Sequence, residues 1–256
     1  MKERIAIVTG ASAGIGAATA VRLAKDLSGI VLVARREKEL EETAKAVTEA
    51  GARPLVLAAD LREAAAAETV VTRTLAAFGR IDVVVNIAGA VPQIPLLEMT
   101  DEQWNDGAGM KLHGARRLTI KAWPHLKATR GAVIFTSGNS ASAPKPAFAA
   151  VATINAAIVA LAKAFAEQGI VDGVQVNSVS PGPVMSNRRL GFLQKWSAAH
   201  AMTEEEAKVK FLQEAQIERY GEPAEIAELM AFVVSPGARW MTGTALRMDG
   251  GEIKTI

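Results

Sequence analysis

The sequence predicts an α/β fold: a single doubly wound parallel sheet with helices on both faces. Apolar runs of strand length alternate with helical patterns along the 256-residue chain, as repeated βαβ units require. Half of the residues are hydrophobic but only 5% are aromatic, which indicates the aliphatic core of a sheet buried on both faces. Because no linker, repeat or low-complexity segment interrupts the pattern, we predict one domain over residues 1–256.

In the first part of the chain, predicted strands and helices alternate. Short apolar runs predict strands, and patterns with helical spacing follow them. Gly51 stands where a helix would be capped, and Pro54 suits the start of a strand. Strands are predicted at Ile5–Val8, Ile30–Val33, Arg53–Ala59 and Ile81–Val85, and helices at 15–27, from Leu40 to Val47 and at 64–78.

The second part continues in the same way. Its longest helical pattern repeats apolar residues from Val151 to Phe165. The chemical motifs follow predicted strands, at the sheet edge where ligands of such folds bind. Further helices are predicted at about 101–122 and 148–168, and further strands at Ala132–Thr136, Val174–Val179 and Ala245–Met248.

Bulk composition narrows the classes of function. A net charge of +2 gives no case for nucleic acid or an anionic membrane. The absence of cysteine excludes disulfides and thiolate metal ligands, and we predict no metal site. No unbroken apolar run reaches the roughly 18 residues of a membrane helix, and a strand pattern begins by Arg4, leaving no room for a signal peptide. We therefore expect a soluble, cytoplasmic protein.

A glycine-rich turn follows the first strand. Gly10, Gly14 and Gly16 allow a tight turn and a close approach of backbone to a ligand. The helix that begins there presents unpaired N–H groups, which suit a pyrophosphate. A glycine turn also occurs without any ligand, so this pattern alone is weak. Further motifs follow it in order: Asp60-Leu61, Asn86-Ile87-Ala88-Gly89, Asn177 to Pro183, and Met248-Asp249-Gly250-Gly251.

This set of motifs resembles the short-chain dehydrogenase/reductase family over essentially the whole chain. The resemblance implies a Rossmann-type fold in which Asp60 and Leu61 contact adenine and Ser186 contacts the nicotinamide. Asn86 and Asn177 have the alternative role of stabilising strand ends. The residues expected to bind the dinucleotide are Gly10, Ser12, Gly14, Ile15, Gly16, Arg35, Arg36, Asp60, Leu61, Asn86, Ala88, Gly89, Asn155, Pro181, Gly182, Val184 and Ser186.

The end of the second strand indicates which dinucleotide is preferred. An acidic residue there would bind a free ribose hydroxyl, but the chain has Ala34, followed by Arg35 and Arg36. Two guanidinium groups are able to bind a 2′-phosphate. We predict NADP(H) rather than NAD(H), with Arg35 as the main contact and Ser12 as a helper. The alternative is that both arginines are ordinary surface charges.

The positions of the family's proton-transfer groups hold other residues. The family uses an Asn, a Ser, a Tyr and a Lys, and its motifs align these with Lys111, Gly138, Val151 and Asn155. The resemblance therefore implies a divergent member that lacks this tetrad.

We considered whether neighbouring residues replace the tetrad. Ser137 should face away because adjacent strand residues alternate, and His113 should point away from Lys111 on a helix. Tyr220 is the only tyrosine, and the family uses its segment structurally. Ser140, Ser142 and Lys145 lie on the loop beside the site.

Asn and Lys have exchanged places at two of these positions. We hypothesise that Lys111 reaches Asn155 and keeps the local hydrogen bonds without a tyrosine to activate. In the alternative, Lys111 extends to solvent and Asn155 caps an emptied pocket.

Family resemblance also implies a helical substrate lid at about 186–218 and a homodimer or homotetramer. The apolar residues of the lid, such as Phe192 and Trp196, either bind a small-molecule ligand or only pack the lid onto the body.

Three functions stay open from the sequence. The first is an NADP(H)-binding protein, oxidoreductase by descent, that lacks tyrosine-dependent hydride transfer. The second is an atypical oxidoreductase or a non-redox isomerase or cyclase that uses the same pocket. The third is a non-catalytic scaffold or partner subunit.

Overall fold

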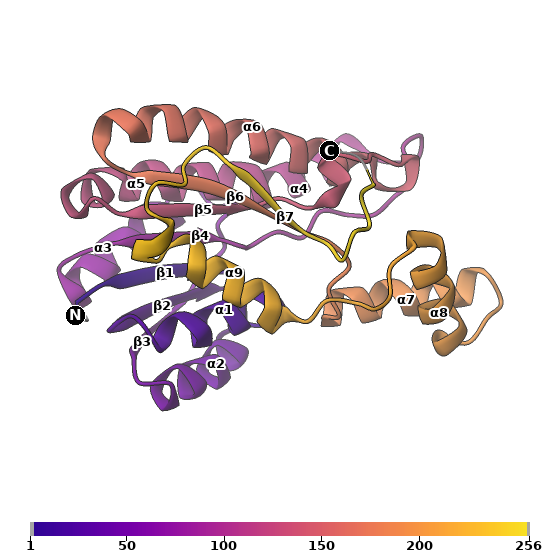
Figure 1. Ribbon diagram of the computed structural model, residues 1–256, viewed down its shortest axis with the longest axis horizontal. Coiled ribbons are helices and arrows are strands. Elements are labelled where there is room, and N and C mark those ends of the chain that lie inside the picture. The colour runs from indigo at the N-terminus through magenta and orange to yellow at the C-terminus, as the bar shows by residue number, and fades with distance from the viewer. Residues whose placement is uncertain (1–2, 255–256) are drawn as a thin grey trace.

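The computed structural model describes residues 3–254 and contains one parallel sheet of seven strands. The strand order is β3-β2-β1-β4-β5-β6-β7, so the winding direction reverses between β1 and β4 (Figure 1). This confirms the predicted doubly wound sheet. The strands are β1 (Ile5–Thr9), β2 (Gly29–Ala34), β3 (Arg53–Ala58), β4 (Val83–Asn86), β5 (Ala132–Thr136), β6 (Gln175–Pro181) and β7 (Ala245–Met248).

The central strands are buried on both faces. In β1 the register pairs Ile7 with Val31 of β2 and with Val84 of β4, and all three side chains are fully buried. One apolar cluster packs the sheet against α1, α2 and α9, and another packs it against α3, α5 and α6. The β-branched and aliphatic residues of the strands fill both layers, which explains the low aromatic content.

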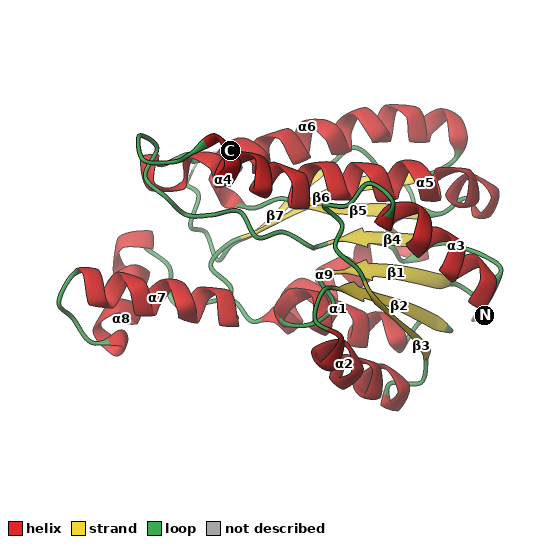
Figure 2. Ribbon diagram, turned by 180° about the vertical axis from the view of Figure 1, so that it is seen from behind, coloured by secondary structure: helices red, strands yellow, loops and turns green. Residues whose placement is uncertain are grey.

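The helices lie on both faces of the sheet, and α7 and α8 project beyond its carboxyl edge (Figures 1 and 2). In Figure 2 the strand arrows point towards these two helices. The helices are α1 (Gly14–Ala24), α2 (Glu37–Glu49), α3 (Ala66–Phe78), α4 (Asp101–Ala108), α5 (Gly114–Thr129), α6 (Ala149–Asp172), α7 (Asn187–Ala199), α8 (Glu204–Ala215) and α9 (Pro223–Val233).

The sequence missed some features of the helices. The single helix expected at 101–122 is α4 and α5 joined by a π-helical turn, Gly109–His113, and α5 continues past Pro124. Helix α9 was not predicted, although Pro223 at its start and a capping box between Glu222 and Glu225 are helix N-terminal signals. Short apolar helices of this kind are defined by packing on the sheet more than by their own periodicity.

Helix α6 corrects one sequence inference. The stretch Pro146–Asp172 is long and apolar enough to cross a membrane by length and composition, which a search for unbroken apolar runs did not reveal. Its residues Ile158, Ala162 and Ala166 are buried in the core under β5 and β6. A core helix passes the same test, so this feature is weak support for a membrane span.

Candidate active site

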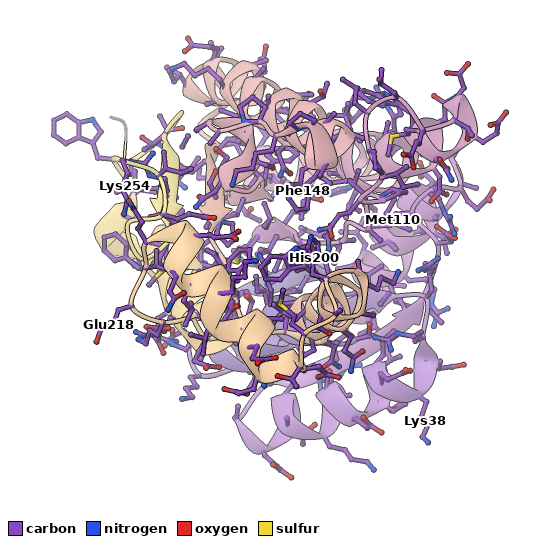
Figure 3. The ribbon with its side chains drawn as sticks, turned by 90° about the vertical axis from the view of Figure 1, so that its right-hand side faces the viewer. Lys38, Met110, Phe148, His200, Glu218 and Lys254 are labelled. Atoms are coloured by element: carbon purple, nitrogen blue, oxygen red, sulfur yellow. The ribbon has the colours of Figure 1, made fainter. Side chains whose placement is uncertain are left out.

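A cavity of about 550 Å³ opens at the carboxyl ends of the four central strands β1, β4, β5 and β6. A glycine stands just beyond each of these strands and lines the cavity: Gly10, Gly89, Gly138 and Gly182. Helices α7 and α8 line its outer side, and the segment 186–218 that contains them is called the lid below. Figure 3 views the molecule from the lid, with α7 and α8 in front of the sheet, and labels Phe148 and Lys254, both of which line the cavity.

The glycine turn after β1 is required by close packing. A Cβ on Gly16 would lie 2.1 Å from the carbonyl oxygen of Gly10, and one on Gly10 would lie 3.0 Å from the backbone nitrogen of Ala88. Gly14 adopts φ +56°, which favours glycine. The turn therefore brings bare backbone to the floor of the cavity.

Helix α1 begins at this turn without a side-chain cap. Its N-cap residue is Ala13, and its first turn contains no acidic residue. The free N–H groups and the positive end of the helix dipole therefore face the cavity without an internal partner. This arrangement fits the pyrophosphate of a dinucleotide.

The expected dinucleotide-binding residues fall into two groups. One lines the cavity, whereas Ser12, Arg35, Arg36, Asp60, Leu61 and Asn86 do not. The members of the first group are Gly10, Gly14, Ile15, Gly16, Ala88, Gly89, Asn155, Pro181, Gly182, Val184 and Ser186.

Most of the second group lies at the ends of β2 and β3. Arg36 donates a hydrogen bond to Ser12 Oγ at 3.2 Å, and the charge of Arg35 helps to lower the pKa of Asp60, after the larger effect of its hydrogen bond from Arg62. Leu61 is buried in the core, where its side chain is unavailable to a ligand.

The two strand-end asparagines have structural contacts. Asn177 donates to Met241 O at 2.7 Å and accepts from Thr244 N at 3.0 Å, which ties β6 to the segment before β7. Asn86 donates to Thr119 Oγ1 at 3.1 Å, while its own Oδ1 is buried without a partner among the described residues. The structural role considered for Asn177 accounts for both the amide nitrogen and the amide oxygen of its side chain.

Lys111 lies in the π-helical turn and is 8% exposed. Its Nζ donates to Ser137 O at 3.0 Å and to Asn155 Oδ1. The predicted contact between Lys111 and Asn155 is confirmed, and the alternative of a solvent-extended lysine is wrong. Single π-turns within helices often occur at functional sites.

Asn155 is the centre of this small network. Its Nδ2 donates to Ser140 Oγ at 2.9 Å, and its backbone oxygen accepts from Ser137 Oγ at 2.8 Å. Ser137 therefore faces helix α6, while its carbonyl group receives Lys111. All the polar groups of this network are satisfied within the protein, as burial requires.

Two glycines provide the space for the pair. A Cβ on Gly138 would lie 2.8 Å from Asn155 Nδ2, and one on Gly89 would lie 2.9 Å from Lys111 Cδ. Gly138 has an extended backbone with φ 168°, so it needs no special conformation. The Asn155 amide therefore limits the size of the side chain that fits at position 138.

Burial and, to a smaller extent, the nearby positive charge of Arg188 together lower the pKa of Lys111 to about 7. Desolvation disfavours the ammonium form. A neutral amine still has two hydrogens for Ser137 O and Asn155 Oδ1. Lys111 is therefore able to exchange a proton near neutral pH without breaking its contacts.

The other candidate groups are placed less favourably. Val151 lines the cavity and packs with Ile154 in a small apolar cluster. Tyr220 donates its hydroxyl to Lys208 O at 3.1 Å and belongs to the lid cluster. His113 is exposed on the helix surface. Of the loop residues, Ser140 and Lys145 line the cavity and Ser142 does not.

The lid is held together by aromatic contacts. Phe192 stacks on Trp196 and meets Phe211 edge to face, with ring centroids 6.2 and 6.1 Å apart. Phe192 and Phe211 also line the cavity. The apolar lid residues thus pack α7 on α8, and two of them face the ligand space as well.

Several cavity residues were missed by sequence reasoning. Arg188 and Arg189 follow Ser186 on α7, and Asn139 donates to Glu252 Oε2 at 2.8 Å. The paired arginines directly after the β6 motif were a signal available in the sequence. The contact between Asn139 and the C-terminal segment was not, because 113 residues separate the two.

Comparison with known proteins gives a consistent family. The family model described as enoyl-(acyl carrier protein) reductase matches residues 10–252. The short-chain reductase protein NovJ of Streptomyces niveus is 31% identical over 98% of this chain and 94% of its own length. A putative ketoacyl reductase of Streptomyces coelicolor is 30% identical over 97% of each chain. The chain belongs to the short-chain dehydrogenase/reductase family.

Solved structures of this family superpose closely on the chain. L-sorbose reductase from Gluconobacter frateurii, complexed with NADPH and L-sorbose, has a TM-score of 0.94 at 29% identity and covers 100% of this chain and 98% of its own. A variant of actinorhodin polyketide ketoreductase with NADPH has a TM-score of 0.92 at 29% identity over 97% of each chain. The short-chain dehydrogenase/reductase fold thus extends over the whole described chain.

Gly138→Ala should destabilise the site. The new Cβ would displace the Asn155 amide and weaken the buried network, at a cost of about 1–3 kcal/mol in the free energy of unfolding. Urea unfolding measures this. The matched control is Gly191→Ala, because a Cβ there meets nothing within 4 Å and a helical Gly→Ala change stabilises by at most about 1 kcal/mol. Equal effects of the two alanines would contradict the steric argument.

Stability should rise with pH through the titration of Lys111. Its pKa is about 7 in the folded chain against an ordinary value of 10.5, so between these values the unfolded chain binds more protons at this residue. The free energy of unfolding therefore increases as pH rises through this window, by at most about 1.4 kcal/mol per pH unit. The Lys111→Met variant should lack this contribution. Urea unfolding at a series of pH values measures it, and the same pH dependence of the unfolding free energy in the variant and the unmodified chain would refute the prediction.

Proposed function

We propose that this chain binds NADP(H) in the cleft and is an oxidoreductase by descent that does not carry out the tyrosine-dependent hydride transfer of its family. The observation that carries the proposal is the wall of the cavity. Val151 stands there at the tyrosine position, and the only tyrosine of the chain is bonded elsewhere. The dinucleotide cradle is kept, while the proton-transfer group beside it is absent.

Several features support binding of the dinucleotide. The uncapped start of α1 and the bare glycine turn fit a pyrophosphate. Ala34 leaves no carboxylate at the end of β2, and Arg35 is exposed beside it and forms no salt bridge with residues 3–254. Two of the similar solved structures contain NADPH. We place the nicotinamide beside Pro181 to Val184 and Ser186.

The proposed loss of standard chemistry follows from the residues that remain. Bound NADPH would supply a hydride, and reduction of a carbonyl also needs a proton at its oxygen. A positioned acid–base group typically contributes about 10²–10⁴-fold to the rate. Asn155 at the lysine position carries no charge with which to lower the pKa of a neighbouring hydroxyl, and Gly138 offers no hydroxyl to orient a substrate.

A second function is favoured by Lys111. This side chain lines the cavity, and its pKa of about 7 suits proton exchange at neutral pH. An atypical oxidoreductase or a non-redox isomerase or cyclase would use it as the acid–base group. A further alternative is a non-catalytic scaffold or partner subunit. The proposed loss of the tetrad supports it.

We further propose a single domain with a substrate lid at about 186–218, a small-molecule ligand and a homodimer or homotetramer. Exposed apolar residues on α5 and α6, Ile120, Ile170 and Val171, support an assembly through these helices. A cytoplasmic location stays a prediction from the sequence.

Titration with both dinucleotides tests the cofactor. NADPH should bind about tenfold or more tightly than NADH, because a charge-assisted hydrogen bond to the 2′-phosphate contributes about 1.5–3 kcal/mol. Arg35→Ala should remove most of this preference and leave NADH affinity unchanged, with the exposed Arg116→Ala as control. Equal affinities for the two dinucleotides in the unmodified chain would reject the proposal.

Restoring the tetrad tests the proposed loss of activity. Asn155→Lys alone would bring a second ammonium group against Lys111, so the test needs Lys111→Asn, Gly138→Ser, Val151→Tyr and Asn155→Lys together. The unmodified chain should not oxidise NADPH against a broad panel of carbonyl compounds, whereas the fourfold variant should gain reductase activity. Turnover by the unmodified chain that survives Lys111→Met would overturn both this proposal and the Lys111 alternative.

A further inference from the structure

Positive charge dominates the lining of the cavity. The side chains of Lys111, Lys145, Arg188, Arg189 and Lys254 face two carboxylates, Glu214 and Glu252. Since cavities surrounded by protein screen charge poorly, an excess of one sign favours a ligand of the opposite sign. The question is which of these cations are free to bind it.

Four of the five have partners within the protein, and the contacts of two of these lie on α8 and on the C-terminal segment. Arg189 lies over the Phe211 ring, 4.6 Å from the ring centroid, and the charge of Glu252 acts on it favourably. Lys254 donates to the backbone oxygens of Gln216 and Gly251. Lys145 is exposed on its loop. Arg189 and Lys254 are thus held by internal contacts, and the side chain of Lys145 is in solvent.

Arg188 differs from them. Its guanidinium donates to Gly89 O at 3.2 Å and to Val91 O at 3.3 Å, both carbonyl groups at the end of β4. It makes no salt bridge within residues 3–254. Much of the residue is exposed to solvent, while desolvation of its guanidinium group lowers its pKa. A guanidinium has five N–H donors, so several stay available for a ligand.

Lys111 lies at the same place. Its aliphatic chain lies against Gly89, the residue whose carbonyl Arg188 contacts. The charge of Arg188 acts on Lys111, and within residues 3–254 no carboxylate balances the two cations. They meet at Gly89, the residue after Ala88, whose backbone lies against Gly10 of the glycine turn.

We infer that the second ligand of this cavity is an organic acid whose anionic group, a carboxylate or a phosphate, binds between Arg188 and Lys111. Arg188 would hold two of its oxygens in the planar geometry that guanidinium groups favour. Lys111 would become an ammonium on binding and donate its third hydrogen. This inference rests on the proposed function, because it assigns the glycine turn and the start of α1 to the dinucleotide.

Small probes test the site without knowledge of the whole ligand. Oxalate would be titrated, with neutral oxamide as its matched control, into the full chain saturated with NADPH. NMR of labelled lysine side chains follows Lys111, whose signal is identified by its loss in Lys111→Met. Millimolar oxalate should raise the pKa of Lys111 by about one, and oxamide should leave it unchanged.

Variants locate the effect. Arg188→Gln should weaken oxalate binding about tenfold or more and abolish its effect on Lys111. Arg53→Gln, an exposed arginine on β3 outside the cavity, serves as the charge control. Binding of oxalate by isothermal titration should take up protons near neutral pH, and Lys111→Met should remove this uptake.

Two results would overturn the inference. One is an unchanged Lys111 pKa at millimolar oxalate. The other is a rise of that pKa on NADPH binding alone with no further response to oxalate, because the anion between the two cations would then be the pyrophosphate. Failure of the proposed function would give another pair of results. NADPH would cause no thermal shift, while oxalate would still raise the pKa of Lys111 in the cofactor-free chain.

Discussion

A buried lysine constrains the whole catalytic side of the cleft. The amine of Lys111 has left solvent, and the free energy of this transfer is acceptable only because Ser137 O and Asn155 Oδ1 accept from it. The residues around Lys111 and Asn155 are compatible with this pair. Gly89 and Gly138 leave the space that its two side chains occupy, and the π-helical turn sets the position from which the lysine starts.

Lys111, Gly138 and Asn155 therefore form one coupled unit. A Cβ at position 138 collides with the Asn155 amide, and a lysine at 155 would meet the amine of Lys111. Interactions within such a network are not additive. Lys111, Gly138 and Asn155 are better understood as a mutually consistent packing solution than as independent choices, and this consistency is why the hydrogen bonds of Lys111 and Asn155 are satisfied.

The two sides of the cleft differ in the kind of constraint that shapes them. On the side of α1, backbone sterics decide, because Gly10 and Gly16 lie too close to neighbouring backbone for any side chain. On the side of Lys111, side-chain electrostatics decide, and no carboxylate among residues 3–254 pairs with Arg188 or Lys111. The second side accounts for the particular chemistry proposed for this chain.

The sequence by itself determined the parallel sheet, the glycine turn and the identity of the residues at the tetrad positions. The sheet and the glycine turn depend on periodicity and on steric rules that operate within a few residues, whereas the tetrad positions were assigned from the resemblance to the family. It also suggested that Lys111 reaches Asn155, but could not exclude a lysine extended to solvent.

Only the tertiary structure decided that choice, together with the contacts of Arg188, the π-helical turn between α4 and α5, and the placement of α9. The contacts of Lys111 join residues 26 and 44 positions apart, and they exist only where β4, β5 and α6 pack side by side. Hydrogen bonds between distant segments depend on strand register and on the volume left by neighbouring side chains, neither of which is encoded in any local window of the chain.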